Sequence, residues 1–306
     1  MSEQWDVMGF GALAVDDLLY VDHFPLANSK THVRARQRQG GGLCATALVA
    51  AARLGAKAAY TGVLGPDELS RFAVEELEGE GVDCSAVLYR PEARPIHSVI
   101  IVDRSTATRN VFSYSLEMIP RQPDEVDEAL IGRCRVLLVD HKAVAGGVRG
   151  AQLARKLGIP VVGDIEDETV PGVQELMALT DHLIVGHEFA GRVTGETDCA
   201  AMVRALAGGR ACCVVTAGER GCWYKERGDE AVYHYPAMPV KAVDTTGCGD
   251  VFHGAYAAAL AMGGGVRRAI AVATATAGIK TTRPGGRSGI PDWATVERFL
   301  REHAPD

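Results

Sequence analysis

The chain lacks the features of a membrane protein or a nucleic-acid-binding protein. Its apolar runs fall short of the roughly 18 residues that a membrane-spanning helix needs. Residues 1–6 have neither the basic start nor the apolar core of a signal peptide. With 32 basic and 39 acidic residues the net charge is −7, so no basic surface for nucleic acid or anionic lipid is expected. We therefore expect a cytoplasmic protein that binds neither nucleic acid nor membranes.

The cysteines lack the spacing of a metal site, because no two are separated by two residues and none has a histidine at ligand spacing. The eight cysteines are Cys44, Cys84, Cys134, Cys199, Cys212, Cys213, Cys222 and Cys248. Cys212 and Cys213 lie in an apolar run that is typical of a buried strand. We interpret the cysteines as small buried hydrophobic side chains rather than as disulfide partners or metal ligands.

Short apolar runs alternate with helical patterns along most of the chain. The runs predicted as buried parallel strands are residues 6–11, 58–63, 136–139, 160–163, 182–185 and 212–216. The segments predicted as helices are residues 45–54, 71–80, 148–157, 173–179, 199–206, 250–262 and 292–302. This alternation predicts an α/β fold with a parallel sheet between two layers of helices. We expect residues 1–306 to form a single domain.

Two segments interrupt the alternation. Residues 18–39 and 94–114 contain alternating, β-rich stretches around turn residues, including 31–36 and 97–102, and they have no helical period. They predict antiparallel strands of a small sheet that is inserted into the main domain.

A glycine-rich turn precedes the alanine-rich helix predicted at residues 250–262. The turn reads Asp244-Thr245-Thr246-Gly247-Cys248-Gly249-Asp250. Its glycines allow backbone amides to point at one anion at the start of a helix, where the dipole favours negative charge. We expect Gly247, Cys248 and Gly249 to donate amides to a phosphoryl group, and Asp250 to accept the proton of an attacking hydroxyl. The alternative is a turn capped by aspartate for structural reasons alone.

This turn and a second glycine-rich segment resemble the two signatures of one enzyme family. Residues 244–250, followed by an alanine-rich helix, resemble the C-terminal signature of the ribokinase (pfkB) family of carbohydrate kinases. Residues 40–55, in which glycines precede a helix that ends in Arg53-Leu54-Gly55, resemble the N-terminal signature. The resemblance implies a ribokinase-like fold whose small sheet forms a lid over the sugar and the contact of a homodimer. It also implies an ATP-dependent, Mg²⁺-using kinase that phosphorylates a primary hydroxyl of a sugar.

The acceptor sugar is expected beside Asp16 and the N-terminal signature. Gly41 and Gly42 allow the backbone to approach a polyhydroxy ligand, with a flexible strand-to-helix turn as the alternative. Asp16 follows a strand and a glycine turn, which predicts a position at the carboxyl edge of the sheet. By resemblance it is the family's substrate aspartate, and Thr46 stands where the family usually has asparagine. Asp17 is expected to point away, since neighbours on a strand face opposite sides.

The nucleotide is expected at a later turn. Residues 214–221 resemble the family's nucleotide turn, in which Thr216, Gly218 and Gly221 would contact ATP. The family's Asn-x-x-Glu motif, whose carboxylate helps to hold hydrated magnesium, is absent from this sequence, and Glu188 is the nearest substitute.

The resemblance also implies a potassium ion beside the anion-binding turn. Asp244 and Thr246 would hold the ion together with carbonyl groups of the glycine-rich loop that precedes the last predicted helix. The residues matched for these carbonyls are Lys280, Arg283, Gly285 and Gly289.

Within the family, residues 40–55, 244–255 and 282–292 resemble the sulfofructose kinase branch. Lys30 matches a basic residue of the sulfonate site, whereas Ser113 and Lys142 stand where asparagine and arginine are expected. The predicted substrate is therefore 6-deoxy-6-sulfofructose. An uncharged ketohexose, another anionic sugar or a nucleoside is the alternative substrate, and a non-catalytic sugar or nucleotide sensor is the alternative function.

Overall fold

An eight-stranded sheet forms the centre of the molecule, in the order β14-β13-β12-β11-β10-β9-β1-β4. The computed structural model describes residues 4–106 and 108–303. The strands are β1 (Trp5–Phe10), β4 (Ala58–Tyr60), β9 (Cys134–Asp140), β10 (Val161–Asp164), β11 (His182–Gly186), β12 (Cys212–Thr216), β13 (Cys222–Glu226) and β14 (Tyr233–Tyr235). From β4 to β12 the neighbours run parallel, and β13 and β14 extend the sheet in antiparallel register.

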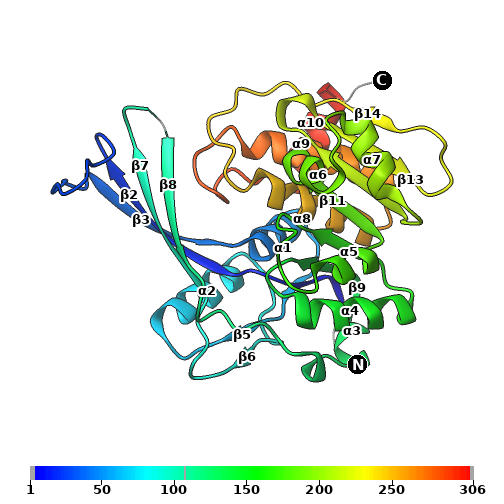
Figure 1. The fold of residues 1–306 in the computed structure, drawn as a ribbon, viewed down its shortest axis with the longest axis horizontal. Coiled ribbons are helices and arrows are strands. Elements are labelled where there is room, and N and C mark those ends of the chain that lie inside the picture. The colour runs from blue at the N-terminus through cyan, green and yellow to red at the C-terminus, as the bar shows by residue number, and fades with distance from the viewer. Residues whose placement is uncertain (1–3, 107, 304–306) are drawn as a thin grey trace.

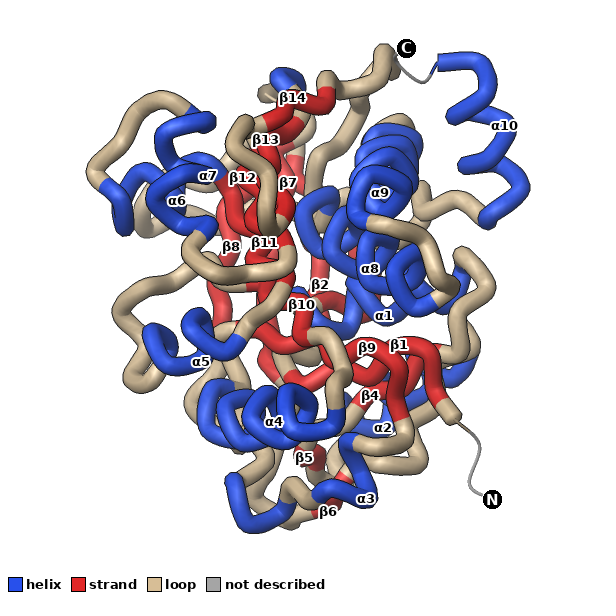
Figure 2. The backbone as a smooth tube through the Cα atoms, turned by 90° about the vertical axis from the view of Figure 1, so that its right-hand side faces the viewer, coloured by secondary structure: helices blue, strands red, loops and turns tan. Residues whose placement is uncertain are grey.

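Helices cover both faces of this sheet (Figure 2). One layer contains α1 (Leu43–Arg53), α2 (Glu68–Gly79), α8 (Cys248–Ala261), α9 (Val266–Lys280) and α10 (Trp293–His303). The other contains α3 (Glu128–Ile131), α4 (Val144–Leu157), α5 (Val173–Leu179), α6 (His187–Thr194) and α7 (Cys199–Ala207). Two short 3-10 turns, η1 (Pro123–Glu125) and η2 (Gly218–Arg220), complete the described helical elements. Within the described residues, no helix has the length and apolar content needed to cross a bilayer.

The strand side chains alternate between two hydrophobic cores. In β9, Val136 and Leu138 pack with α1 and α8, whereas Leu137 and Val139 pack with α4 and α5. Side chains of a strand point to opposite faces in turn, so a strand that is covered on both faces needs a continuous apolar run. This explains why the runs identified in the sequence are not alternating. The cysteines also behave as predicted: seven are buried, Cys248 is half-buried, and all are free thiols.

A second, four-stranded sheet projects from the body, in the order β3-β2-β7-β8 (Figure 1). Its strands are β2 (Ala14–Val21), β3 (Ala35–Gly41), β7 (Ile96–Asp103) and β8 (Thr108–Tyr114). We call it the small sheet. The inserted sheet is confirmed, but its two central strands, β2 and β7, run parallel to each other, and β3 begins only at Ala35 rather than at Thr31. A further two-stranded sheet joins β5 (Val63–Leu64) to β6 (Leu88–Tyr89).

The crossing of α1 and α8 fixes the two helices that follow the glycine-rich signatures. A methyl group at Gly254 in α8 would lie 1.9 Å from the carbonyl oxygen of Ala47 in α1 and 2.7 Å from its Cα atom. Only a glycine allows this approach, because the obstructing atoms belong to the backbone and cannot rotate away. The starts of both helices are therefore held at one fixed separation.

We predict that Gly254→Ala lowers the melting temperature, because the two helices must separate to accept the methyl group. Overpacking of this kind costs about 1–3 kcal/mol, although alanine is the better helix former. Gly79→Ala is the matched control, since a methyl group at Gly79 in α2 meets nothing within 4 Å. Thermal unfolding monitored by circular dichroism measures both variants, and equal melting temperatures for Gly254→Ala and wild type would contradict the role of this crossing.

Candidate active site

The start of α8 presents backbone amides to open space. Gly247 is the N-cap and adopts φ +71°, a left-handed conformation that favours glycine. The Cys248 amide donates to the Thr245 carbonyl at 3.2 Å. It is therefore not free to bind an anion, in contrast to the prediction from the sequence. The amides of Gly249 and Asp250 donate to no backbone carbonyl within the described part of the chain, and a methyl group at Gly249 would meet no atom within 4 Å. Free amides at a helix start attract an anion.

Asp250 lies in the first turn of α8, beside these amides, and is half-buried. Burial raises the pKa of its carboxyl well above the ordinary value of 3.8, and the neighbouring carboxylates of Asp164 and Glu166 raise it further. A carboxylate whose pKa moves toward neutrality is a better proton acceptor near pH 7 than an ordinary aspartate. Asp250 therefore combines the position and the protonation behaviour of a general base.

Asp164 and His253 pack beneath Asp250. Asp164 ends β10, is buried, and its Oδ2 atom has no hydrogen-bond donor in the described residues, although His253 Nδ1 lies 3.4 Å away. His253 faces the Gly249 carbonyl through Nδ1 at 2.8 Å and the Ile184 carbonyl through Nε2 at 2.9 Å. The histidine thus connects the first turn of α8 to the middle of β11. Asp164 was not predicted from the sequence, although its place at the end of a buried strand was a signal for it.

Asp16 lies at the base of the small sheet, against the N-terminal signature. The Ser98 hydroxyl donates to its carboxylate, but burial outweighs this bond and raises the pKa of Asp16. A methyl group at Gly41 would lie 2.3 Å from Asp16 Oδ2, and one at Gly40 would lie 2.3 Å from Nη1 of Arg287. The glycines of the signature therefore leave room for a carboxylate and a guanidinium side by side.

Arg287 is a site residue that was not predicted from the sequence. Its Nε atom donates to Thr46 Oγ1 at 3.2 Å, and its Nη2 atom donates to the Gly41 carbonyl at 2.9 Å. Burial lowers the pKa of Arg287 to about 10, while the nearby Asp16 carboxylate favours its charged form. The structure thus brings the predicted residues Asp16, Gly41 and Thr46 together around one buried cation.

Gly42 has a structural role in addition to its predicted one. It is the N-cap of α1 with φ +91°, and a methyl group there would lie 2.5 Å from the Ala12 carbonyl oxygen. Nearby, the buried Asp140 carboxylate accepts amides of Ala12 at 2.7 Å, Cys44 at 3.2 Å and Lys142 at 2.8 Å. Burial raises the pKa of Asp140 to about 6. These contacts tie the ends of β1 and β9 to the start of α1.

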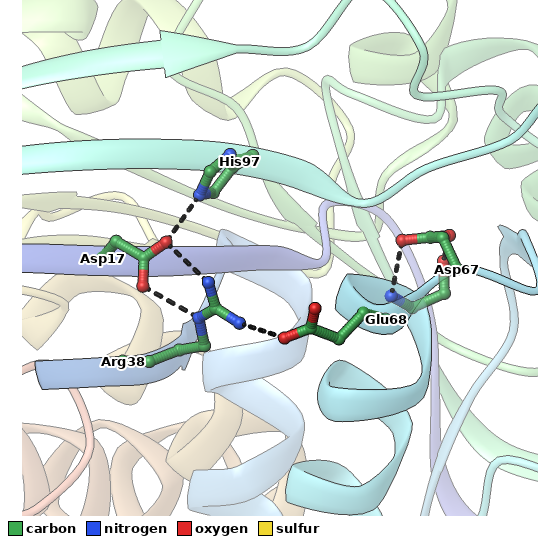
Figure 3. A network of polar contacts seen from close by, with 6 residues as sticks. Asp17, Arg38, Asp67, Glu68 and His97 are labelled. Atoms are coloured by element: carbon green, nitrogen blue, oxygen red, sulfur yellow. Dashed lines mark hydrogen bonds and ion pairs between the residues drawn. The ribbon is translucent and has the colours of Figure 1, made fainter.

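Asp17 faces away from Asp16, as predicted. Its carboxylate accepts from Arg38 Nε at 2.8 Å and lies 2.8 Å from His97 Nε2, and Arg38 Nη1 bridges to Glu68 at 2.8 Å (Figure 3). The hydrogen bond from Arg38 is the main reason why the pKa of Asp17 falls to about 2. This network joins the outer face of the small sheet to α2.

The three residues matched to the sulfonate site lie on separate elements. Ser113 in β8 is in register with Ser98 in β7, which is in register with Asp16. Lys142 is exposed on the loop between β9 and α4. Lys30 is exposed in the connection between β2 and β3, beyond the last pair of those strands at residues 20 and 35. Only Ser113 shares a row of the small sheet with Asp16.

The residues predicted for the nucleotide lie at the hairpin between β12 and β13. Thr216 ends β12, and its hydroxyl donates to the Val185 carbonyl at 3.4 Å. Gly218 adopts φ +57° and would meet nothing within 4 Å if it carried a methyl group. Gly221 adopts φ +83°, and a methyl group there would lie 2.2 Å from the Tyr235 carbonyl oxygen. Gly221 is therefore required by the packing of residue 235, whereas Gly218 faces open space.

The structure differs from the potassium site that the resemblance implied. Lys280 contributes its ammonium rather than its carbonyl: Nζ donates to the carbonyl oxygens of Asp244, at 3.1 Å, and Thr246. The Asp244 carboxylate accepts the amides of Thr246 and Gly285, both at 2.8 Å. The Lys280 carbonyl instead accepts the Arg283 amide at 3.3 Å, and a methyl group at Gly289 would lie 2.2 Å from that oxygen. These groups do not fit a potassium ion, because a cation already contacts two of its expected ligand residues.

Known proteins share both the sequence and the fold. Residues 6–293 match the profile of the pfkB family carbohydrate kinases. Ribokinase of Haemophilus influenzae is 28% identical over 306 residues, which cover 96% of this chain and 97% of that protein. Fructokinase-2 of Oryza sativa subsp. japonica is 25% identical over 325 residues, which cover 97% and 94%. The solved structure of Arabidopsis thaliana ribokinase complexed with ribose and ATP has a TM-score of 0.86 at 22% identity, covering 97% and 99%.

The family profile spans nearly the whole chain, and the residues that carry its two signatures form the sites described above. The chain belongs to the pfkB family of carbohydrate kinases and is an ATP-dependent sugar kinase.

Proposed function

We propose that the protein transfers the γ-phosphoryl group of ATP to a primary hydroxyl of a ketose-type sugar, with Asp250 as the general base. The observation that carries this proposal is the raised pKa of a carboxylate beside unbonded amides at a helix start. The amides of Gly247 and Gly249, neither of which donates to a backbone carbonyl in the described residues, stabilise the negative charge of the phosphoryl group during transfer. The Cys248 amide takes no part, because the Thr245 carbonyl already accepts it. The presence of Asp250, the proposed general base, argues against a non-catalytic sensor, because a sensor has no need of a base.

The acceptor sugar binds between Asp16 and the start of α1. The Asp16 carboxylate accepts hydrogen bonds from vicinal hydroxyls, and the Thr46 hydroxyl adds a short polar contact. Arg287 connects the two sides of this pocket, because it donates hydrogen bonds to both the Gly41 carbonyl and the Thr46 hydroxyl. The relatives support a small sugar, since one is named ribokinase and another fructokinase. The ketose assignment follows the sequence resemblance.

The nucleotide binds along the hairpin of Thr216 and Gly218, where a ligand can approach the backbone closely. Mg²⁺ accompanies ATP in phosphoryl transfer and neutralises charge on the phosphates. Oxygen ligands suit this ion, and the carboxylates near Asp250 are those of Asp164 and Glu166. We assign Mg²⁺ to this edge rather than to Glu188 on α6, because Glu166 lies close enough to Asp250 to raise the pKa of its carboxyl. Glu166 replaces the missing carboxylate of the family motif.

We propose 6-deoxy-6-sulfofructose as the substrate, on the strength of the sequence resemblance to the sulfofructose branch. The position of Ser113 in the row of Asp16 and Ser98 supports a longer acceptor that reaches across the small sheet. Lys142 lies next to the Asp140 contacts at the carboxyl edge of the main sheet. Uncharged ketohexoses are the alternative substrates under this proposal.

We further propose that the small sheet is a lid and the contact of a homodimer. Its outer strand β8 and the following residues expose large apolar side chains, namely Val111, Phe112, Tyr114 and Leu116. Apolar side chains grouped on one exposed strand are typical of a protein interface, and an edge strand offers unpaired backbone groups to a second copy.

Asp250→Asn is predicted to lower kcat by roughly 10²–10⁴, the usual contribution of a positioned base, with little change in the KM for ATP. The base acts in its deprotonated form and its pKa is raised, so the wild-type rate should fall on the acid side well above pH 3.8. The variant should lose this limb of the pH profile. Asp124→Asn, at an exposed aspartate, is the control. An Asp250→Asn rate within threefold of wild type would exclude this mechanism.

The charge of the acceptor is tested with Lys142→Ala and Lys30→Ala. A charge-assisted hydrogen bond contributes about 1.5–3 kcal/mol, so each loss should lower kcat/KM for the sulfosugar roughly tenfold to a hundredfold. The kcat/KM for fructose should change little, because fructose has no anion to pair with the lysines. Lys142→Arg should raise the sulfosugar activity by restoring a planar fork. Preference of the wild type for fructose would contradict the sulfosugar assignment and leave the kinase assignment intact.

The dimer is tested with Phe112→Asp, which places a charge on the exposed strand β8. If the small sheet forms the interface, light scattering after size-exclusion chromatography should show the wild type at twice the mass of the variant. Leu157→Asp, at an exposed leucine that ends α4, should keep the wild-type mass. A wild-type monomer, or a dimer that both variants retain, would contradict this interface.

A further inference from the structure

A lysine ammonium is buried beside the anion-binding turn. Lys280 ends α9, and its side chain is 0% exposed, which is rare for lysine. Its ammonium donates to the carbonyl oxygens of Asp244, at 3.1 Å, and Thr246. A lysine ammonium can donate three hydrogen bonds, and two backbone carbonyls occupy two of them.

The two carbonyls belong to the turn that leads into α8. The Asp244 carboxylate closes this turn by accepting the Thr246 amide, and it fastens the turn to the following loop by accepting the Gly285 amide. Thr246 directly precedes Gly247, the N-cap of α8. The ammonium therefore determines where the turn ends and where the free amides of α8 begin.

The charge of Lys280 also acts on this site. Burial lowers the pKa of Lys280, whereas Asp244, Cys248 and Asp250 favour its protonated form. Carbonyl oxygens that converge on one point repel each other unless a cation lies between them. An ammonium and a potassium ion carry the same charge and are of similar size, so the same carbonyl oxygens hold one of them at a time.

We propose that the Lys280 ammonium is a built-in substitute for a monovalent cation, so that the kinase orders its anion-binding turn without potassium. This inference rests on the proposed function, because the ordered turn is the one assigned to the phosphoryl group. It also distinguishes this chain from the potassium-dependent arrangement that its sequence resemblance implied.

The first test uses the wild-type enzyme with Mg²⁺·ATP and a panel of ketoses. Rates are measured in potassium, sodium and choline chloride at one ionic strength. We expect the three rates to agree within about twofold, since the cation is covalently part of the chain. Activation by potassium of more than about fivefold over choline would overturn the proposal.

The second test compares Lys280→Ala with Lys280→Met. Both variants lose the charge, but alanine leaves space for an ion and methionine fills it. Loss of two charge-assisted hydrogen bonds should lower kcat roughly tenfold to a hundredfold in sodium or choline. Potassium should restore much of the activity of Lys280→Ala and little of that of Lys280→Met. Lys241→Ala, at an exposed lysine near the same turn, should behave like the wild type.

Thermal unfolding gives a readout that needs no substrate. Potassium should raise the melting temperature of Lys280→Ala above its value in choline chloride, because an ion that binds only the folded state stabilises it. Wild type and Lys280→Met should melt equally in both salts. Equal melting of Lys280→Ala in both salts would overturn the proposal. This result is separable from the proposed function: inactivity of the wild type on every sugar would count against the kinase assignment and leave the melting comparison decisive for Lys280.

Discussion

Four carboxylates, those of Asp16, Asp140, Asp164 and Asp250, gather where the parallel strands end, and burial raises the pKa of each. A buried carboxylate is costly unless its oxygens accept hydrogen bonds or pair with a cation. Asp140 is compensated by three backbone amides, and Asp16 by Ser98 and the nearby charge of Arg287. Asp164 retains an oxygen without a donor in the described residues. The compensation is least complete beside Asp250, which is the residue proposed to accept a proton during phosphoryl transfer.

The small sheet is fastened to the body through both faces of its base. On one face, Arg287 donates a hydrogen bond to the Gly41 carbonyl, and its positive charge lies near the Asp16 carboxylate. On the other, Asp17 and Arg38 connect to Glu68 of α2 (Figure 3). The half-exposed ion pairs on that outer face contribute little stability, since pairs in contact with water are typically worth about 0–1 kcal/mol. If the small sheet closes over a ligand, as proposed, its strands must bend beyond the fastened base, or the outer network must break before the buried contacts do.

The sequence predicted the features that depend on local pattern and missed those that depend on distant contacts. Buried strands such as β9 and β12 were recognisable, because a strand covered on both faces needs an uninterrupted apolar run. Helix α9 was not predicted, since it is rich in alanine and threonine and is buried on most sides, which leaves no polar face to reveal a helical period. Arg287 and the ammonium of Lys280 were also missed as site groups. Their partners lie in α1 and in the 244–247 turn, and no spacing along the sequence records which way a long side chain points.

The end of α9 and the loop that follows it contribute to both halves of the site. Lys280 gives a cation to the turn before α8, and Arg287 gives one to the pocket between Asp16 and Thr46. In the same loop, the Gly285 amide donates a hydrogen bond to the Asp244 carboxylate. Gly289 lies so close to the Lys280 carbonyl that any side chain at position 289 would collide with that carbonyl. A shift of this loop would therefore move both cations together. Such coupling would keep the proposed acceptor pocket and the amides proposed to bind the phosphoryl group in register, and in-line phosphoryl transfer depends on that alignment.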